Sequence, residues 1–167
     1  MVDNRERCTL MCQDDQPLEV DLEDSKQSVL ITGLIDDAGT DDPIPVPNVT
    51  KDVMEKIMLF CAHVRESGAE PVIEQPLPSN DLTKHVDAWY ATFIIDGVDQ
   101  ALLFDLVIAA NYLDIKPLLR LASARIAALI KGKSIEEIRQ FFKMTNDFTP
   151  EEEQRIIEEN NFAAEYF

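Results

Sequence analysis

The sequence contains few basic residues. Its 15 Lys and Arg residues are outnumbered by 32 Asp and Glu residues, which gives a formal net charge of −17. Nucleic acids and anionic lipid surfaces are bound through basic surfaces, because their phosphates repel carboxylates. We therefore expect no nucleic-acid partner and no membrane partner. The excess of carboxylates indicates a solvated acidic surface, or one that binds basic partner proteins.

Cysteine is also scarce. The chain has three, Cys8, Cys12 and Cys61, and this odd number at irregular spacing predicts no disulfide framework. Reduced thiols are typical of the cytosol and nucleus, so we expect a cytoplasmic and nuclear protein. Residues 1–7 carry charges of both signs and no long apolar run follows them, so no signal peptide is predicted.

The residue patterns of common catalytic and cofactor sites are missing. The five glycines are scattered, so no phosphate-binding loop is predicted. Cys8 and Cys12 have no second pair to complete a zinc site, and buried apolar thiols are the better interpretation. No Cys–His or Ser–His motif surrounds His63 or His85, and a small hydrolase would need a pocket that holds one of them. We expect no enzyme, no metal and no cofactor.

Apolar residues, in contrast, are plentiful at 46% of the 167 residues, which suits one domain with a small appendage. The longest apolar stretch, residues 101–113, is too short to span a bilayer. At 3.6 residues per turn it has two apolar faces, one with Leu106 and another with Phe104 and Ile108. A helix of this kind is buried on more than one side. One face can pack on the protein's own core and the other on a partner.

The order of the predicted elements indicates an α+β fold. Residues 8–12 and 17–22 flank a polar turn and predict a β-hairpin. A helix is predicted over 24–34 and a flexible acidic loop over about 36–43. The extended segment 44–49 should be an edge strand, because its prolines cannot donate to a β-ladder. A small three-stranded sheet packed with helices is therefore expected in a first domain, residues 1–131.

Helices follow the predicted sheet. Prolines and a lack of periodicity predict a flexible excursion over about 67–84. Thr50 is a plausible N-cap and Pro117 a first-turn proline. The predicted helices cover residues 51–66, 89–95, 99–113 and 117–130.

The remaining residues, 132–167, predict a separate extension of two to three helices. Ser134 and Glu137 have capping-box spacing, and Thr149 with Glu152 repeats it. The last helix carries few apolar residues on an acidic body, so it must pack on another surface to be stable.

Four segments form a recognisable set. They are DDPIPVPNV at 41–49, LFDLVIAANYLDIKPLL at 103–119, IKGKSIEEIR at 130–139 and NDFTPEEE at 146–153. In this order they resemble the S-phase kinase-associated protein family over nearly the whole chain. The resemblance implies a BTB/POZ fold with a C-terminal helical extension. It also implies a non-catalytic adaptor of an SCF-type E3 ubiquitin ligase, which bridges F-box substrate receptors to a cullin scaffold for ubiquitin-dependent protein degradation.

The resemblance further implies two sets of contact residues. Asn111 and Tyr112 match the family's contacts to the cullin N-terminal domain, although Tyr112 can also complete a core ridge. The positions that match the family's F-box contacts are Leu103, Phe104, Val107, Ile108, Ser123, Ile126, Ala127, Ile130, Ile138, Phe142 and Phe162. Some residues of this F-box set must instead belong to the protein's own core.

Three positions invite comparison with the family. Its common Asn-Gln-Trp-Cys tail is replaced here by a stretch with Phe162, which keeps an aromatic ring but loses area and the indole donor. Ser123 replaces a small thiol. Pro150 matches a proline that is hydroxylated and glycosylated in some protist members, and it is a candidate modification site, although a first-turn proline needs no such explanation.

Two alternative functions stay open. An elongin-C-like adaptor would lack F-box binding and the helices after residue 131, and a self-associating BTB/POZ scaffold would bind no cullin. The apolar faces of the helices at 99–113 and 117–130 are larger than one small core can hide, which predicts a partner interface, or a homodimer when the chain is free. We also expect the last helices to be mobile alone and to become ordered on binding.

Overall fold

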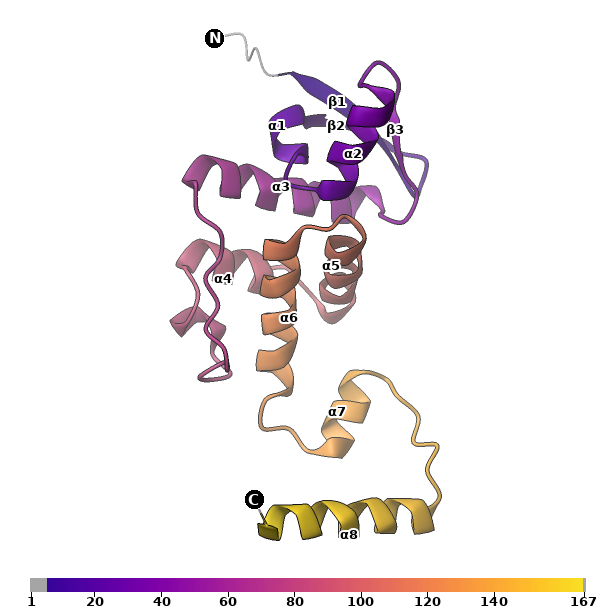
Figure 1. Ribbon diagram of the computed structural model, residues 1–167, viewed down its shortest axis with the longest axis vertical. Coiled ribbons are helices and arrows are strands. Elements are labelled where there is room, and N and C mark those ends of the chain that lie inside the picture. The colour runs from indigo at the N-terminus through magenta and orange to yellow at the C-terminus, as the bar shows by residue number, and fades with distance from the viewer. Residues whose placement is uncertain (1–5, 167) are drawn as a thin grey trace. The chain divides into compact units, whose positions relative to one another are not determined.

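The computed structural model describes residues 6–166, and for residues 161–166 it describes the backbone only. The chain forms two compact units, residues 1–131 and residues 132–167. The first unit contains the sheet and helices α1 to α6, and the second contains α7 and α8 (Figure 1). The predicted α+β arrangement followed by helices is therefore confirmed.

The sheet has three strands in the order β2-β1-β3. The central strand β1 (Arg7–Cys12) pairs antiparallel with β2 (Pro17–Asp21) and parallel with β3 (Ile44–Val46). Alternate residues of β1, including Cys8 and Leu10, point into the core and are buried. The predicted hairpin and the predicted edge position of the proline-containing strand are both confirmed.

The single helix predicted over residues 24–34 is wrong, because the structure has two helices there. Helix α1 (Leu22–Ser25) ends before Ser28, and α2 (Val29–Ala38) begins after it. The backbone of Ser28 is extended, and its hydroxyl accepts a hydrogen bond from the amide of Ile31 at 3.1 Å. A serine that caps a helix in this way cannot lie inside one, so it separates the two helices.

Helix α2 packs on the core through Ile31. That side chain is fully buried, whereas the side chain of Val29, at the first position of the helix, is 61% exposed. The helix continues through Asp36 and Asp37, which the sequence pattern places in a loop, and it ends at Ala38, just before Gly39 with φ +79°.

Helices α3 (Lys51–Ser67) and α4 (Ala88–Ile95) bring the aromatic core together. The ring of Phe60 on α3 lies 5.7 Å from the Tyr90 ring and 5.6 Å from the Phe93 ring. Between these helices the chain has little regular structure apart from a short turn of 3₁₀ helix, η1 (Leu82–Lys84). The predicted helix over 51–66 is confirmed, and its buried residues include Val53, Ile57, Phe60, Cys61 and Val64.

Helices α5 (Gln100–Tyr112) and α6 (Lys116–Ile130) pack side by side in the first unit (Figure 1). The tight turn between them contains Asp114, which has a left-handed backbone conformation with φ +50°. Aspartate accepts this conformation more readily than most residues do. Within the described part of the chain, neither these nor the other helices are both long and apolar enough to cross a membrane.

The second unit contains α7 (Ile135–Phe141) and α8 (Pro150–Tyr166). At the start of α7, Ser134 and Glu137 form both hydrogen bonds of a capping box. At the start of α8, the amide of Glu152 donates to the Thr149 hydroxyl at 3.3 Å, and the Thr149 amide donates to the Glu152 carboxylate at 2.9 Å. Both predicted caps are confirmed.

Candidate protein-interaction site

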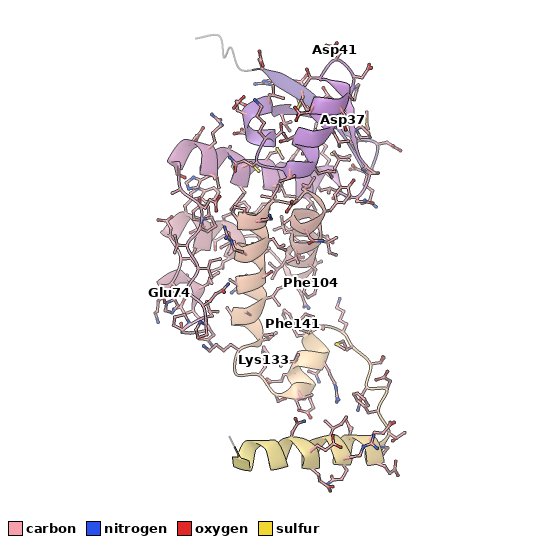
Figure 2. The ribbon with its side chains drawn as sticks, in the orientation of Figure 1. Asp37, Asp41, Glu74, Phe104, Lys133 and Phe141 are labelled. Atoms are coloured by element: carbon pink, nitrogen blue, oxygen red, sulfur yellow. The ribbon has the colours of Figure 1, made fainter. Side chains whose placement is uncertain are left out.

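Helix α5 has one face in the core and another at the surface. Leu106 and Ala109 are buried, whereas the side chain of Ile108 is 62% exposed. Phe104, labelled in Figure 2, is half-buried. The two apolar faces predicted for this helix are therefore present. Of the residues assigned to the F-box by resemblance, Leu103 is only 2% exposed and belongs to the core.

The C-terminal end of α5 presents the two residues assigned to the cullin. Asn111 is exposed and Tyr112 is half-buried against the core. Ile108 precedes them by three and four residues, so all three lie on one face of the helix. The helix end is fixed from the neighbouring α2, because the Leu113 carbonyl accepts a hydrogen bond from the buried Ser28 hydroxyl at 2.6 Å.

Helix α6 presents a second surface. Ser123 and Ala127 are exposed, while Ile126 and Ile130 are half-buried. Both exposed positions line a groove of about 310 Å³. The same groove is lined by residues of the excursion after α3, which the resemblance did not assign to any contact. It is bordered by Ile73, Glu74, Gln75, Leu77, Leu119, Arg120, Ser123, Ala124 and Ala127.

The second unit leaves its apolar side chains accessible. None of the described side chains of residues 132–160 is buried. Of the residues predicted here to bind the F-box, Ile138 is half-buried and Phe142 is 37% exposed. The side chain of Phe162 lies outside the described residues. A helix pair without a buried side chain has no core of its own to stabilise it.

A groove within the second unit was missed at the sequence level. It has a volume of about 260 Å³. Three isoleucines could have indicated this groove. Ile156 and Ile157 are adjacent in an otherwise acidic helix, and Ile135 follows the Ser134 cap. The groove is lined by Ile135, Glu136, Arg139, Phe148, Glu153, Ile156 and Ile157.

Polar contacts connect α7 to α8. The Arg139 guanidinium lies 3.0 Å from the Glu153 carboxylate and 5.8 Å from the centroid of the Phe148 ring. The Asn146 amide donates to the same carboxylate at 2.8 Å. Partly exposed contacts of this kind contribute little stability individually. They orient the two helices while leaving the apolar groove open.

The pKa shifts of the Glu152 carboxyl and of the cysteine thiols follow from helix capping and from burial. The backbone amide and the hydroxyl of Thr149 hold the pKa of Glu152 below its usual range. Burial raises the pKa of the Cys61 thiol to about 12. Burial also raises the pKa values of Cys8 and Cys12. Neutral, buried thiols behave as small apolar core groups.

A pocket in the first unit does hold both histidines. It has a volume of about 640 Å³, and both His63 and His85 line it. The Ser79 hydroxyl lies 2.8 Å from Nε2 of His85, but no described residue hydrogen bonds to Nδ1, where an orienting group would be needed. The His63 ring stacks on Trp89, with centroids 3.6 Å apart. Among the side chains that the structure describes, those of residues 6–160, no cluster of His, Cys, Asp and Glu could hold a metal ion.

Comparisons with known proteins connect both units to one family. The model of the Skp1 family tetramerisation domain matches residues 6–66, and that of the Skp1 family dimerisation domain matches residues 116–163. The S-phase kinase-associated protein 1 homolog of Tetrahymena thermophila is 47% identical over 157 residues, which cover 93% of each chain. The E3 ubiquitin ligase complex SCF subunit sconC of Arthroderma benhamiae is 40% identical over 161 residues, or 95% of this chain and 96% of that protein. The subunit of the same name from Emericella nidulans is 41% identical over 153 residues, or 91% and 92% of the two chains.

Proposed function

Because the chain belongs to the Skp1 family and its first unit has the BTB/POZ fold, we propose that it is a non-catalytic adaptor of an SCF-type E3 ubiquitin ligase. In this role it bridges F-box substrate receptors to a cullin scaffold for ubiquitin-dependent protein degradation. The names of its relatives as subunits of SCF ubiquitin ligase complexes support the proposal.

The observation that carries the proposal is the absence of buried side chains among the described residues of the second unit. Three of its large apolar side chains, Ile135, Phe148 and Ile157, are at least 47% exposed. Exposed apolar groups at this density mark a surface that another protein covers. The expected partner is an F-box domain, which would bury Ile138 and Phe142 of the second unit and contact Ser123 and Ala127 on α6 of the first.

The cullin contact is proposed at the end of α5. Asn111 offers an exposed amide, and Tyr112 and Ile108 offer apolar surface on the same helix face. We therefore propose that Ile108 contacts the cullin, although the family resemblance matches this residue to the F-box. Neither contact requires chemistry from the adaptor. No described residue orients the Ser79–His85 pair as a hydrolase would need, and binding alone accounts for the proposed function.

Separate pull-downs with a recombinant F-box domain and a recombinant cullin N-terminal domain test the proposal. The wild-type chain should capture both. Asn111→Asp combined with Tyr112→Ala should lose the cullin and keep the F-box domain. Leu59→Ala is the matched control, because it truncates a side chain that is 55% exposed on α3, and it should keep both partners.

The same pull-downs distinguish the alternatives. Capture of the cullin alone would favour an elongin-C-like adaptor. Capture of neither, with a homodimer in light scattering, would favour a self-associating scaffold.

For an adaptor we also propose that the free chain forms homodimers through its exposed apolar surface, and that an F-box domain dissociates them.

We propose that the protein resides in the cytoplasm and nucleus, in keeping with its three unpaired cysteines. A fluorescent fusion seen in both compartments supports this location, and a secreted fusion contradicts it.

Pro150 is proposed as a modification site. It is exposed and occupies the first turn of α8. A first-turn proline has no amide to donate, so a hydroxyl on its ring would disturb no helix hydrogen bond. Intact-mass spectrometry of the native protein should show an addition that disappears in Pro150→Ala. A native mass equal to that of the sequence would contradict the proposal.

A further inference from the structure

The excursion after α3 is held against α6. Its residues 69–81, which we name the strap, descend from the end of α3 toward the C-terminal end of α6 (Figure 1). Near one end, the Glu70 carboxylate lies 2.8 Å from the Arg120 guanidinium. Near the other, the Lys131 ammonium donates to the carbonyls of Leu77 at 2.5 Å and Pro78 at 3.1 Å. These contacts fix the strap at two points, at Arg120 in α6 and at Lys131 just beyond the end of the helix.

The strap also has apolar anchors. Ile73 and Leu77 are partly buried and pack against the core of the first unit. Between these two residues and α6 lies the groove of about 310 Å³. A groove of this size, lined in part by polar side chains, holds several water molecules. An apolar side chain that entered the groove would replace this water and be attracted by the hydrophobic effect.

The strap leaves the floor of the groove open. Leu119, Ser123 and Ala127 are spaced by four residues and lie on one face of α6. The small side chains of Ser123 and Ala127 stay exposed beside the strap. A segment that competed with the partner would cover these two positions. Because it does not, the strap forms a second wall of the groove and does not occlude it.

The groove is lined by one cation and one carboxylate. Arg120 is the groove's basic residue, and it is already paired with Glu70 of the strap. Glu74, labelled in Figure 2, lines the groove and forms no ion pair within the described residues. The net charge of −17 adds to the negative potential. A partner with a cation beside its apolar side chain fits this surface best.

We propose that the strap is part of the F-box docking surface and selects among F-box partners. The groove takes an aliphatic side chain of the F-box domain, and a neighbouring Lys or Arg of that domain pairs with Glu74. This inference rests on the proposed adaptor function, because Ser123 and Ala127 were assigned to the F-box contact there. It adds a specificity-determining segment in which no contact residue had been expected.

The first test is isothermal titration of the full-length chain with a recombinant F-box domain whose docking segment carries an aliphatic residue next to a Lys or Arg. Ile73→Ala should weaken binding by about tenfold, since truncating a buried interface anchor commonly has an effect of this size. Val72→Ala is the matched control. Val72 is the adjacent residue, is 79% exposed and does not line the groove, so its truncation should leave affinity unchanged.

The second test reverses the charge at the rim. Glu74→Lys should weaken binding by about fivefold and make the affinity less sensitive to salt, because an attractive pair is replaced by a repulsive one. Asp37→Lys carries the same change in net charge on α2, at a different part of the first unit (Figure 2). It should leave the affinity within about twofold of wild type.

A thiol at the groove reports occupancy directly. The three native cysteines are buried, so Ser123→Cys introduces the one exposed thiol. A saturating F-box domain should slow its alkylation at least about tenfold, and Ile73→Ala in the same background should reduce this protection at subsaturating partner. Unchanged alkylation in a formed complex would overturn the proposal.

The outcomes separate the two levels of inference. If the wild-type chain binds no F-box domain, the adaptor function itself fails. If it binds normally and both Ile73→Ala and Glu74→Lys behave as their controls do, only the role of the strap is wrong. Tighter binding by Ile73→Ala would show that the strap competes with the partner, and this also contradicts the proposal. Thermal unfolding of Ile73→Ala near the wild-type temperature excludes misfolding as the cause of a loss.

Discussion

Ser28→Ala is the sharpest probe of how the fold fixes the end of α5. The Ser28 side chain is fully buried and connects two elements that are 85 residues apart in sequence. Its hydroxyl donates to the Leu113 carbonyl at 2.6 Å and accepts from the Ile31 amide at 3.1 Å. Alanine removes both hydrogen bonds with almost no change in packing volume.

The expected loss follows from these two bonds. Removing an N-cap hydroxyl costs about 1 kcal/mol. The Leu113 carbonyl also loses its better donor and keeps only the Leu30 amide, at 3.4 Å, which adds about 1 kcal/mol. The free energy of unfolding should therefore fall by roughly 2 kcal/mol. For a chain of this size, that corresponds to a decrease of about 4–8 °C in Tm.

Urea unfolding followed by far-ultraviolet circular dichroism measures the loss. Thr50→Ala is the matched control, because Thr50 occupies the N-cap position of α3 but its side chain makes no capping hydrogen bond. That variant should lose less than about 0.5 kcal/mol. An equally small loss for Ser28→Ala would refute the reasoning, since it would mean that neither bond of the buried hydroxyl contributes to stability.

Three further predictions concern the caps and the thiols. The Thr149 amide lowers the pKa of Glu152. The N-terminal cap of α8 should therefore be complete at pH values above the ordinary glutamate pKa, and it should be lost as the pH falls through the lowered pKa. Amide hydrogen exchange at the start of α8 measures this loss. Ser134→Ala removes one bond of the α7 capping box and should speed amide exchange in α7 by about fivefold, with α6 unchanged. All three cysteines should resist alkylation near about pH 8 in the native protein and react after unfolding in urea, because burial raises their pKa, that of Cys61 to about 12.

The local structure was largely predictable from the sequence. The hairpin, the helix α3 and the caps at Ser134 and Thr149 depend on residues close together in the chain, and each prediction is confirmed. The break at Ser28 was missed because its cause is distant. The carbonyl that accepts a hydrogen bond from Ser28 belongs to Leu113, and no local sequence pattern predicts a hydrogen bond between residues so far apart.

The candidate site was predictable only in part. The two apolar faces of α5 follow from helical periodicity. Periodicity does not show which residues of the family's contact set lie in the core. Leu103 is buried and Ile108 is exposed, although both are apolar. The strap could not be predicted, because its pairing of Glu70 with Arg120 spans 50 residues and its sequence has no periodicity. The resemblance assigned no residue of the strap to a contact.

The acidic composition agrees with an adaptor that recruits partners. Negative surface charge speeds association with basic partners. The two proposed surfaces use different side chains, with Asn111 and Tyr112 on α5 for the cullin and Ser123 and Ala127 on α6 for the F-box domain. Occupation of one should therefore leave the other available.

Native mass spectrometry of the full-length chain, mixed with an F-box domain and a cullin N-terminal domain, tests this most directly. The account predicts a complex that contains one copy of each protein, and the Asn111→Asp, Tyr112→Ala variant should leave only the complex with the F-box domain. Two binary complexes that never combine, or no complex at all, would contradict the claim that this chain joins two partners through separate surfaces.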